Sequence, residues 1–342
     1  GAGTFGSVSP ISSSSQLRLW SQDNFGDDLI SCIRGGGIFL WDESAGATQR
    51  AVAFSDLSGA SNPPIIALQI MMSDVDKHII CFGANTIGGS TADPLLVRWS
   101  DKESSIDWTP TSTNQAGGVQ LSQGSTIIGA LRTRQEILIW TDVGIVSMRF
   151  VGEPFIFSFS EVAQGPSLIS PNAAVNANNR VYFMDRGGFY SYSGNAQRLA
   201  CTVLDHIYSD INLGQQFKVF GTSNENNNEV IWFYPSANST EIDKYVIYNY
   251  LENTWSIGTT SDGFTRTAWI EAPSLDFPLA AAKTTGSNTN YLYNQEIGHS
   301  NDGEAFTAYI ESSDFDLAPD GERFTFISKL IPDIEFRDQQ ST

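Results

Sequence analysis

Short runs of aliphatic and aromatic residues, separated by polar turns, dominate the pattern along the chain. The clearest stretch, Glu229–Gly258, begins with five apolar residues, Val230–Tyr234, which Pro235 ends. A polar connection leads to a second run, Tyr245–Tyr250, and a short turn leads to Trp255. β-branched and aromatic residues fill the runs, and Pro, Asn, Ser and Asp lie between them. This arrangement predicts antiparallel strands joined by short loops.

The same strand–turn–strand theme recurs about six times at roughly the 40–50-residue spacing that propeller blades require. Further predicted strands are Leu17–Trp20, Leu29–Ile33, Ile38–Asp42, Ile65–Met72, His78–Phe82, Leu95–Trp99, Ile127–Leu131, Ile137–Trp140, Ile145–Phe150, Val181–Met184, Phe189–Tyr192, Leu279–Ala282 and Tyr291–Tyr293. A turn is expected at Asp23–Gly26, and a triple glycine, Gly35–Gly37, precedes Ile38. The copies are not sequence repeats, and the WD40 and kelch signatures do not occur. We therefore expect an all-β fold, a β-propeller-like arrangement of antiparallel meanders, with tandem β-sandwiches as the alternative.

One stretch has helical periodicity. Apolar side chains between Val203 and Ile211 recur at spacings of three and four residues. Thr202 with Asp205 has the spacing of a capping box. The pattern predicts one short helix whose apolar face packs against the sheets.

Composition agrees with a folded, loop-rich β protein. Of the 342 residues 41% are hydrophobic and only 17% are charged, and no apolar run approaches the roughly 18 residues of a membrane helix. Residues 1–16, rich in Gly and Ser, are expected to be a linker or loop, and residues 17–342 a single β-propeller-type domain. We expect the chain to be a segment of a longer protein, so this domain can be incomplete at both ends.

The net charge of −19, from 38 acidic and 19 basic residues, argues against sequence-specific binding of nucleic acid. Solubility of a large surface explains such a charge. So does a channel or contact face that must not adhere to a polyanion. Composition leaves both interpretations open.

The three cysteines, Cys32, Cys81 and Cys201, are odd in number and widely spaced. No disulfide framework is therefore expected, and assembly in a reducing cytoplasm is the simpler interpretation.

No motif assigns a cofactor or metal. Gly1, Gly3 and Gly6 match the dinucleotide-binding string, but no strand precedes them and Pro10 opposes a following helix. The histidines His78, His206 and His299 have no second ligand at zinc-binding spacing. An acidic cluster is better explained as a solvated loop than as a Ca²⁺ site, because Ala318 and Pro319 interrupt it. Its members are Asp314, Asp316, Asp320 and Glu322.

No catalytic group can be singled out either, and we expect a protein that is not an enzyme. Ser261–Phe264 with Trp269 partly matches a sialidase Asp-box, but the Trp is displaced and no second copy occurs. Paired carboxylates of a glycosidase cannot be picked from the many acidic residues. A sugar-binding platform could be built from strand aromatics, although core packing is the better interpretation. These aromatics are Trp232, Tyr234, Tyr248 and Trp255.

Several blocks, in one order over residues 17–295, resemble the tail nozzle or packaged-DNA-stabilisation proteins at the head-to-tail connector of short-tailed bacteriophages. The blocks are Leu96–Asp101 with Asp107–Pro110 and Thr113–Gly117, Ile139–Asp142 with Met148–Gly152, Leu168–Ala173, and Trp232–Ser236 followed by Tyr245–Tyr250 and Glu252–Trp255. The family's N-terminal segment is missing from this chain.

The resemblance implies a structural virion protein that assembles as a ring, six-fold by expectation, below the portal and adaptor proteins. Such a ring would form the distal DNA channel, retain the packaged genome, contact a tail needle, spike or fibre, and open for ejection. It implies a place in the virion tail after assembly in the host bacterial cytoplasm, with no stable membrane insertion and no cofactor. Few phosphate-binding cations on the channel wall would let DNA pass easily, which would give the net charge a purpose. The alternative from another class is a glycan-binding or glycan-cleaving propeller used in host attachment.

Overall fold

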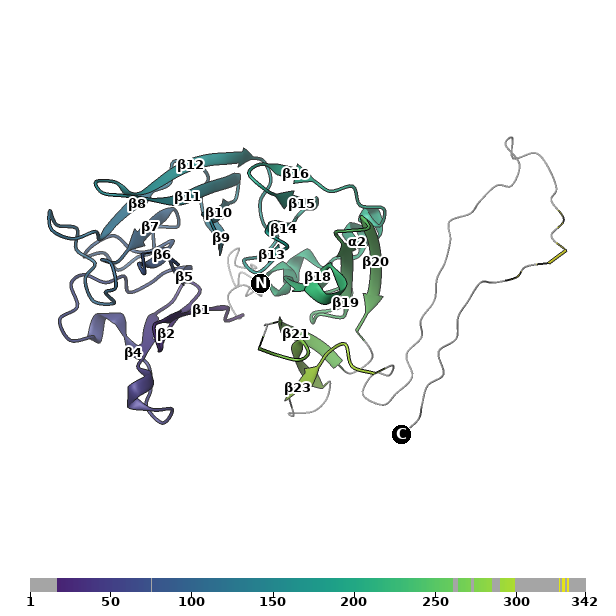
Figure 1. The fold of residues 1–342 in the computed structure, drawn as a ribbon, viewed down its shortest axis with the longest axis horizontal. Coiled ribbons are helices and arrows are strands. Elements are labelled where there is room, and N and C mark those ends of the chain that lie inside the picture. Colours follow the sequence, from purple (N-terminus) through teal and green to yellow (C-terminus); the bar gives the residue numbers. More distant parts are fainter. Residues whose placement is uncertain are drawn as a thin grey trace, which may run out of the picture.

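Six antiparallel sheets surround a common centre, so the protein is a six-bladed β-propeller (Figure 1). The computed structural model describes residues 17–298, except 75, 261–263, 272–273 and 285–289, together with 326, 328–329 and 331. The prediction of a propeller of meanders is confirmed, and tandem β-sandwiches are not the architecture.

Each blade is a meander whose strands follow one another from the centre outward. Blade 1 contains β1 (Trp20–Phe25), β2 (Asp28–Ile33), β3 (Ile38–Trp41) and β4 (Val52–Ala53). Blade 2 contains β5 (Gln69–Met72), β6 (Ile79–Phe82), β7 (Leu96–Trp99) and β8 (Gly117–Gln120). Blade 3 contains β9 (Ile127–Arg132), β10 (Ile137–Thr141), β11 (Gly144–Gly152) and β12 (Ile156–Gln164).

The second half of the ring repeats this plan. Blade 4 contains β13 (Ala174–Ala177), β14 (Arg180–Asp185), β15 (Gly188–Tyr192) and β16 (Ala196–Arg198). Blade 5 contains β17 (Phe220–Asn224), β18 (Glu229–Tyr234), β19 (Lys244–Asn249) and β20 (Thr254–Thr259). Blade 6 has three strands within the described residues, β21 (Phe264–Ile270), β22 (Leu279–Thr284) and β23 (Asn290–Asn294).

The inner strands lie nearest the centre in Figure 1, where β1, β5, β9, β13 and β21 are labelled. They begin at residues 20, 69, 127, 174, 220 and 264, so the spacing runs from 44 residues (220 to 264) to 58 (69 to 127). The expected spacing of 40–50 residues therefore holds for most blades. The exception is blade 2, whose long loops increase the spacing to the next inner strand to 58 residues.

The apolar core lies between successive blades. One cluster contains Ile30 and Cys32 of blade 1 together with Ile70 and Cys81 of blade 2. The largest joins blades 3, 4 and 5, and in it Trp232 contacts Phe189 at 4.9 Å between ring centroids. Burial of apolar faces between neighbouring sheets is what stabilises the ring.

The one α-helix of the described residues, α2 (Leu204–Asp210), precedes blade 5 and buries Ile207 completely. The predicted helix is confirmed. Its capping box is wrong, because the N-cap residue is Val203 and no side chain caps the helix. No described helix has the length and apolar character needed to cross a bilayer.

One strand prediction was displaced along the chain. Residues 17–19 precede the first strand, and most of the stretch expected to turn at Asp23 belongs to β1. The chain turns instead at Gly26 and Asp27, with Gly26 at φ +66°. This shift places Asp23 in an inner strand.

Candidate functional site: the central cavity

A cavity of about 570 Å³ lies at the centre of the propeller, and residues of all six inner strands line it. Lining residues include Ser21 and Asp23 of β1, Gln69 of β5, Arg132 of β9, Ala174 of β13, Gly221 of β17 and Trp269 of β21. Every blade thus contributes to one shared site. A volume of this size lies within the range of about 300–1,000 Å³ typical of small-molecule pockets.

The cavity wall is polar on one side because successive side chains of a strand point to opposite faces. In β1 the exposure alternates from residue to residue. Ser21 and Asp23 of this strand turn toward β5, where they accept hydrogen bonds from the backbone N–H groups of Ile70 and Met72, both at 2.9 Å. Side chains of blade 1 therefore hold the inner edge of blade 2.

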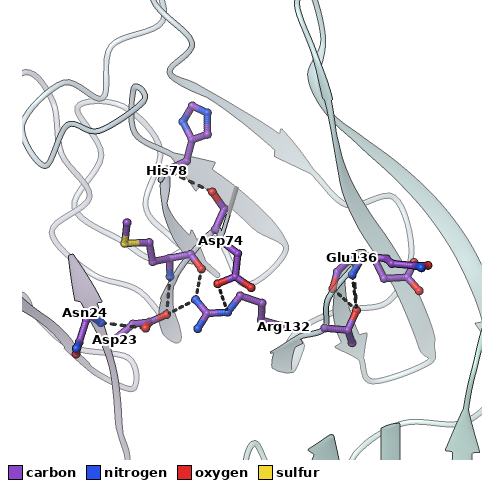
Figure 2. A network of polar contacts seen from close by, with 10 residues as sticks. Asp23, Asn24, Asp74, His78, Arg132 and Glu136 are labelled. Carbon is purple, nitrogen blue, oxygen red and sulfur yellow. Dashed lines mark hydrogen bonds and ion pairs between the residues drawn. The ribbon is translucent and has the colours of Figure 1, made fainter. Parts of the chain in front are cut away.

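Asp23 and Arg132, which line the cavity, belong to an ion-pair network (Figure 2). The Arg132 guanidinium contacts Asp23 Oδ2 at 2.9 Å and Asp74 Oδ1 at 3.1 Å, and it donates to the Met72 carbonyl at 2.6 Å. The other oxygen of Asp23 accepts the N–H of Asn24 at 2.9 Å. These contacts tie blades 1, 2 and 3 together. They pair the Arg132 guanidinium with both the Asp23 and the Asp74 carboxylates.

Gln69 joins blades 2 and 3 beside this network. Its Oε1 accepts the Ala130 N–H at 2.8 Å, and its Nε2 donates to the Ala130 carbonyl at 2.7 Å. The carboxamide therefore satisfies both backbone groups of one residue in the neighbouring inner strand.

Arg34 is another lining residue. It lies in the turn between β2 and β3, and its guanidinium donates to the carbonyls of Leu68 at 3.4 Å and Ile127 at 3.1 Å. It also lines a second cavity of about 210 Å³ with Leu17, Leu19 and Phe217.

Aromatic residues also line the wall, namely Trp20, Phe220 and Trp269. Trp20 is 48% exposed, and Trp269 packs 5.9 Å from the Phe233 ring. Exposed aromatic faces bind apolar or sugar-like groups.

The side chains that line the cavity are better suited to binding a ligand than to acid–base catalysis. Asp23 is the one carboxylate among the lining residues, and Arg132 pairs with it. Glycoside hydrolysis of the usual kind needs two carboxyl groups with different protonation states. Within the described residues, no group of three or more His, Cys, Asp and Glu side chains is placed to hold a metal ion.

A second polar centre joins blades 3 and 4 away from the cavity. Glu136 accepts hydrogen bonds from Tyr192 Oη at 2.9 Å, from Arg149 Nε at 3.0 Å and Nη2 at 2.9 Å, and from the Ser147 hydroxyl. Its side chain is 7% exposed. Burial alone would raise the pKa of the Glu136 carboxyl, but the hydrogen bonds from Ser147, Arg149 and Tyr192 outweigh it and hold the pKa below its ordinary value.

Comparison with known proteins assigns no activity to the chain. No family model and no curated protein sequence matches the chain. Among solved structures it is similar to Hsv2 of Kluyvelomyces marxianus, at 8% identity and a TM-score of 0.42 over 86% of this chain and 77% of that one. It is also similar to the extracellular domain of a one-component system protein of B. thetaiotaomicron, at 9% identity and a TM-score of 0.49 over 82% of this chain and 32% of that one.

An apocarotenoid oxygenase from Synechocystis is a third similar structure, at 10% identity and a TM-score of 0.42 over 77% of this chain and 64% of that one. Resemblances of this strength do not justify transferring a substrate or reaction.

The candidate aromatic platform is core. Trp232, Tyr234 and Tyr248 are at most 5% exposed, and Trp255 stacks on Trp232 at 6.3 Å. The prediction that these side chains pack inward is confirmed.

His78 is fully buried, and Nδ1 lies 2.8 Å from the Ser100 carbonyl oxygen. Burial lowers its pKa, which favours the neutral ring. The ring packs edge-on against Phe157 at 5.4 Å. His206 lies in α2.

His299, the Gly1–Gly6 string, Ser261–Gly263 of the candidate Asp-box and the acidic cluster lie outside the described residues. The members of that cluster are Asp314, Asp316, Asp320 and Glu322.

Sequence reasoning named Asp23 only as a turn residue and Trp269 only as part of a candidate Asp-box, and it assigned no role to Gln69, Arg132 or Arg34. One signal was available in the sequence. A polar or charged residue stands at the beginning or the end of the first apolar run of a blade, as Gln69 does at the beginning of β5 and Arg132 at the end of β9. Asp23 had been assigned to a turn, which hid its place in β1.

Proposed function

We propose that the chain is a structural propeller of a short-tailed phage, a ring-forming tail nozzle that surrounds the distal DNA channel, retains the genome and opens for ejection. The resemblance described above carries this proposal. Its residue blocks fall in blades 2, 3 and 5 and in the connection that precedes blade 4, and they include the buried residues Trp99, Trp140 and Trp232. The likeness therefore follows the frame of the propeller over most of its length.

The best example of this frame is Arg98, which is 3% exposed. Its guanidinium donates to the carbonyls of Asn85 at 3.2 Å, Asn62 at 2.7 Å and Trp108 at 3.4 Å. One side chain thus fixes two loops of blade 2 and the connection that precedes this blade. A residue with this role maintains the shape of the blade. Its presence in one of the resembling blocks therefore supports a fold shared with that family more than a shared reaction.

The use of polar groups in the cavity also favours a structural role. Asp23, Gln69 and Arg132 are committed to bonds between blades. Because they are engaged in this way, these three side chains are not free to bind a ligand. In the proposed ring, contacts between different surface patches of successive copies would close the assembly.

The net charge of −19 suits a channel that passes DNA, because each cation that neutralises a phosphate adds salt-dependent affinity. Portal or adaptor proteins above and a needle, spike or fibre below are the proposed partners, and DNA would pass without sequence-specific binding.

Electron microscopy tests the proposal directly. We expect the protein, purified or in virions of the phage that encodes it, to lie in a ring on the tail axis. A protein that is absent from virions, and monomeric at every concentration tested, would contradict the proposal. A ring channel lined with Lys and Arg would contradict the explanation of the charge.

The alternative, a glycan-binding or glycan-cleaving propeller, draws support from Trp20 and Trp269 in the cavity wall. A glycan array and a hydrolase panel separate the two functions. The nozzle predicts no signal in either, whereas specific glycan retention that Trp20→Ala abolishes would favour host attachment.

A further inference from the structure

Arg34 is held at the propeller centre by the triple-glycine turn. Gly35 has φ +68°, a backbone region that favours glycine, and this geometry reverses the chain directly after Arg34. The Arg34 N–H donates to the Leu19 carbonyl and the Gly35 N–H to the Ala67 carbonyl, both at 2.8 Å. These bonds fix the backbone at Arg34, and the carbonyls of Leu68 and Ile127 hold its guanidinium.

This guanidinium lacks a counter-charge. Its hydrogen-bond partners are two carbonyl oxygens, and no carboxylate of the described residues forms an ion pair with it. Residues 1–16, which precede β1, contain no Asp or Glu. Burial lowers the pKa of Arg34 to about 10, as expected for a cation withdrawn from water without an anionic partner.

Two other buried or half-buried arginines, Arg132 and Arg98, are compensated differently. Arg132 lines the same cavity and pairs with two carboxylates. Arg98 has only carbonyl partners, but it has three of them and lies away from the cavity. Arg34 has two carbonyl partners, and its Cζ atom lies 5.9 Å from the centroid of the Phe217 ring, which satisfies no N–H group in its plane. A guanidinium carries five N–H donors, so Arg34 keeps donors next to open space.

The paired charges lie too far away to neutralise Arg34. Its partner Leu68 and the Arg132 partner Met72 are four residues apart in the β5 segment, which corresponds to about 13 Å of strand. Among the lining residues the single carboxylate of Asp23 faces two guanidinium groups. The cavity is thus positive at the Arg34 end, within a chain of charge −19.

We propose that Arg34 binds a small organic oxyanion, a phosphate or carboxylate group on a sugar-sized body, at the centre of the propeller. The planar fork of a guanidinium suits bidentate contact with either group. The cavity of about 570 Å³ accommodates the body of the ligand, with the exposed ring of Trp20 in its wall. The site is independent of ring assembly, so it stands or falls separately from the proposed function.

Thermal unfolding with added ligand tests the site. Inorganic phosphate, glucose 6-phosphate and gluconate are compared with neutral glucose at matched ionic strength, because a ligand that binds only the folded state raises Tm. We expect the anions, and not glucose, to raise Tm, and isothermal titration to give a dissociation constant. A higher affinity for glucose 6-phosphate than for phosphate would show that the cavity holds the body of the ligand. Gluconate distinguishes a carboxylate from a phosphate.

Arg34→Gln is the decisive variant, because it keeps a side chain that can bond the two carbonyls and removes the charge. We expect anion affinity to fall at least about tenfold, the loss typical of one charge-assisted hydrogen bond. Arg34→Lys keeps the charge without the fork and is expected to bind with intermediate affinity.

Arg132→Gln is the matched control in the same cavity. It is expected to lower Tm in buffer and to keep the anion-dependent rise. Two results would overturn the proposal. One is a wild-type protein whose Tm no anion raises. The other is an Arg34→Gln variant that is less stable but shows the full anion-dependent rise, which would make Arg34 a link between blades only.

Discussion

The hydroxyl of Tyr192 in blade 4 donates a hydrogen bond of 2.9 Å to the carboxylate of Glu136 in blade 3. Tyr192 is 3% exposed, so this contact joins the two sheets where water is largely excluded. Replacing Tyr192 with Phe is expected to lower the free energy of unfolding by roughly 1.5–3 kcal/mol, as for other hydrogen bonds to a charged group. Urea denaturation followed by tryptophan fluorescence measures the change.

Tyr190→Phe in the same strand is the matched control. The Tyr190 ring stacks on Phe183 at 5.3 Å, and its hydroxyl has no hydrogen-bond partner among the described residues. Equal losses in the two variants would contradict the assignment of the stability to the Glu136 contact.

Glu136 also makes stability depend on pH. Its folded-state pKa is lowered, so the unfolded chain binds a proton more readily, and the contribution is complete above the unfolded value of 4.5. As pH falls below that value the contribution declines, and it is lost once pH passes the folded-state pKa. Chemical denaturation between pH 7 and pH 3 is expected to show a smaller acid-induced loss for Glu136→Gln than for the wild type. Parallel curves for the two proteins would argue against this linkage.

The Asp23–Arg132 pair is expected to couple blades 1 and 3 energetically. Their side chains are 20% and 34% exposed, so solvent screens the pair only in part. A double-mutant cycle of Asp23→Asn and Arg132→Gln is expected to give a coupling free energy of about 0.5–1.5 kcal/mol. The control cycle uses Lys77 and Glu103, which are 3.5 Å apart and more than half exposed, and should give a value near zero. Similar couplings in both cycles would contradict the structural role of the cavity pair.

The buried thiols are expected to be chemically silent in the folded protein. Burial raises the pKa of Cys32 to about 12 and moves that of Cys81 upward too, and the thiolate is the reactive form. Ellman's reagent at pH 8 is expected to leave both unmodified in the native protein, to modify the half-buried Cys201 slowly, and to titrate all three in denaturant. Rapid native labelling of Cys32 or Cys81 would show that blades 1 and 2 separate readily.

The sequence supported prediction of the fold more than of the cavity. Middle strands such as β10 and β18 are buried on both faces, so each appears as an uninterrupted apolar run that pattern analysis detects. Inner strands such as β1 and β17 contain Ser, Asn, Asp and Gly, because one face borders the cavity and the other packs closely against a neighbour. They lack the apolar signal and were missed or displaced.

The same reason hides the cavity residues. Asp23, Gln69 and Arg132 meet only when blades 1, 2 and 3 are assembled, and 109 residues separate the two ends of this set in sequence. No local spacing rule links residues so far apart. Arg34 could have been suspected from its place before three glycines, but its missing counter-charge is visible only in three dimensions.

The Gln69 carboxamide offers Ala130 one donor and one acceptor, the pair that an adjacent strand would offer. Blades 2 and 3 are thereby connected at their inner edges as if by a single added peptide unit. Because both bonds share one rigid amide plane, tension that pulls the two blades apart must break them together. The innermost contact between these blades should therefore yield abruptly under force, without gradual lengthening.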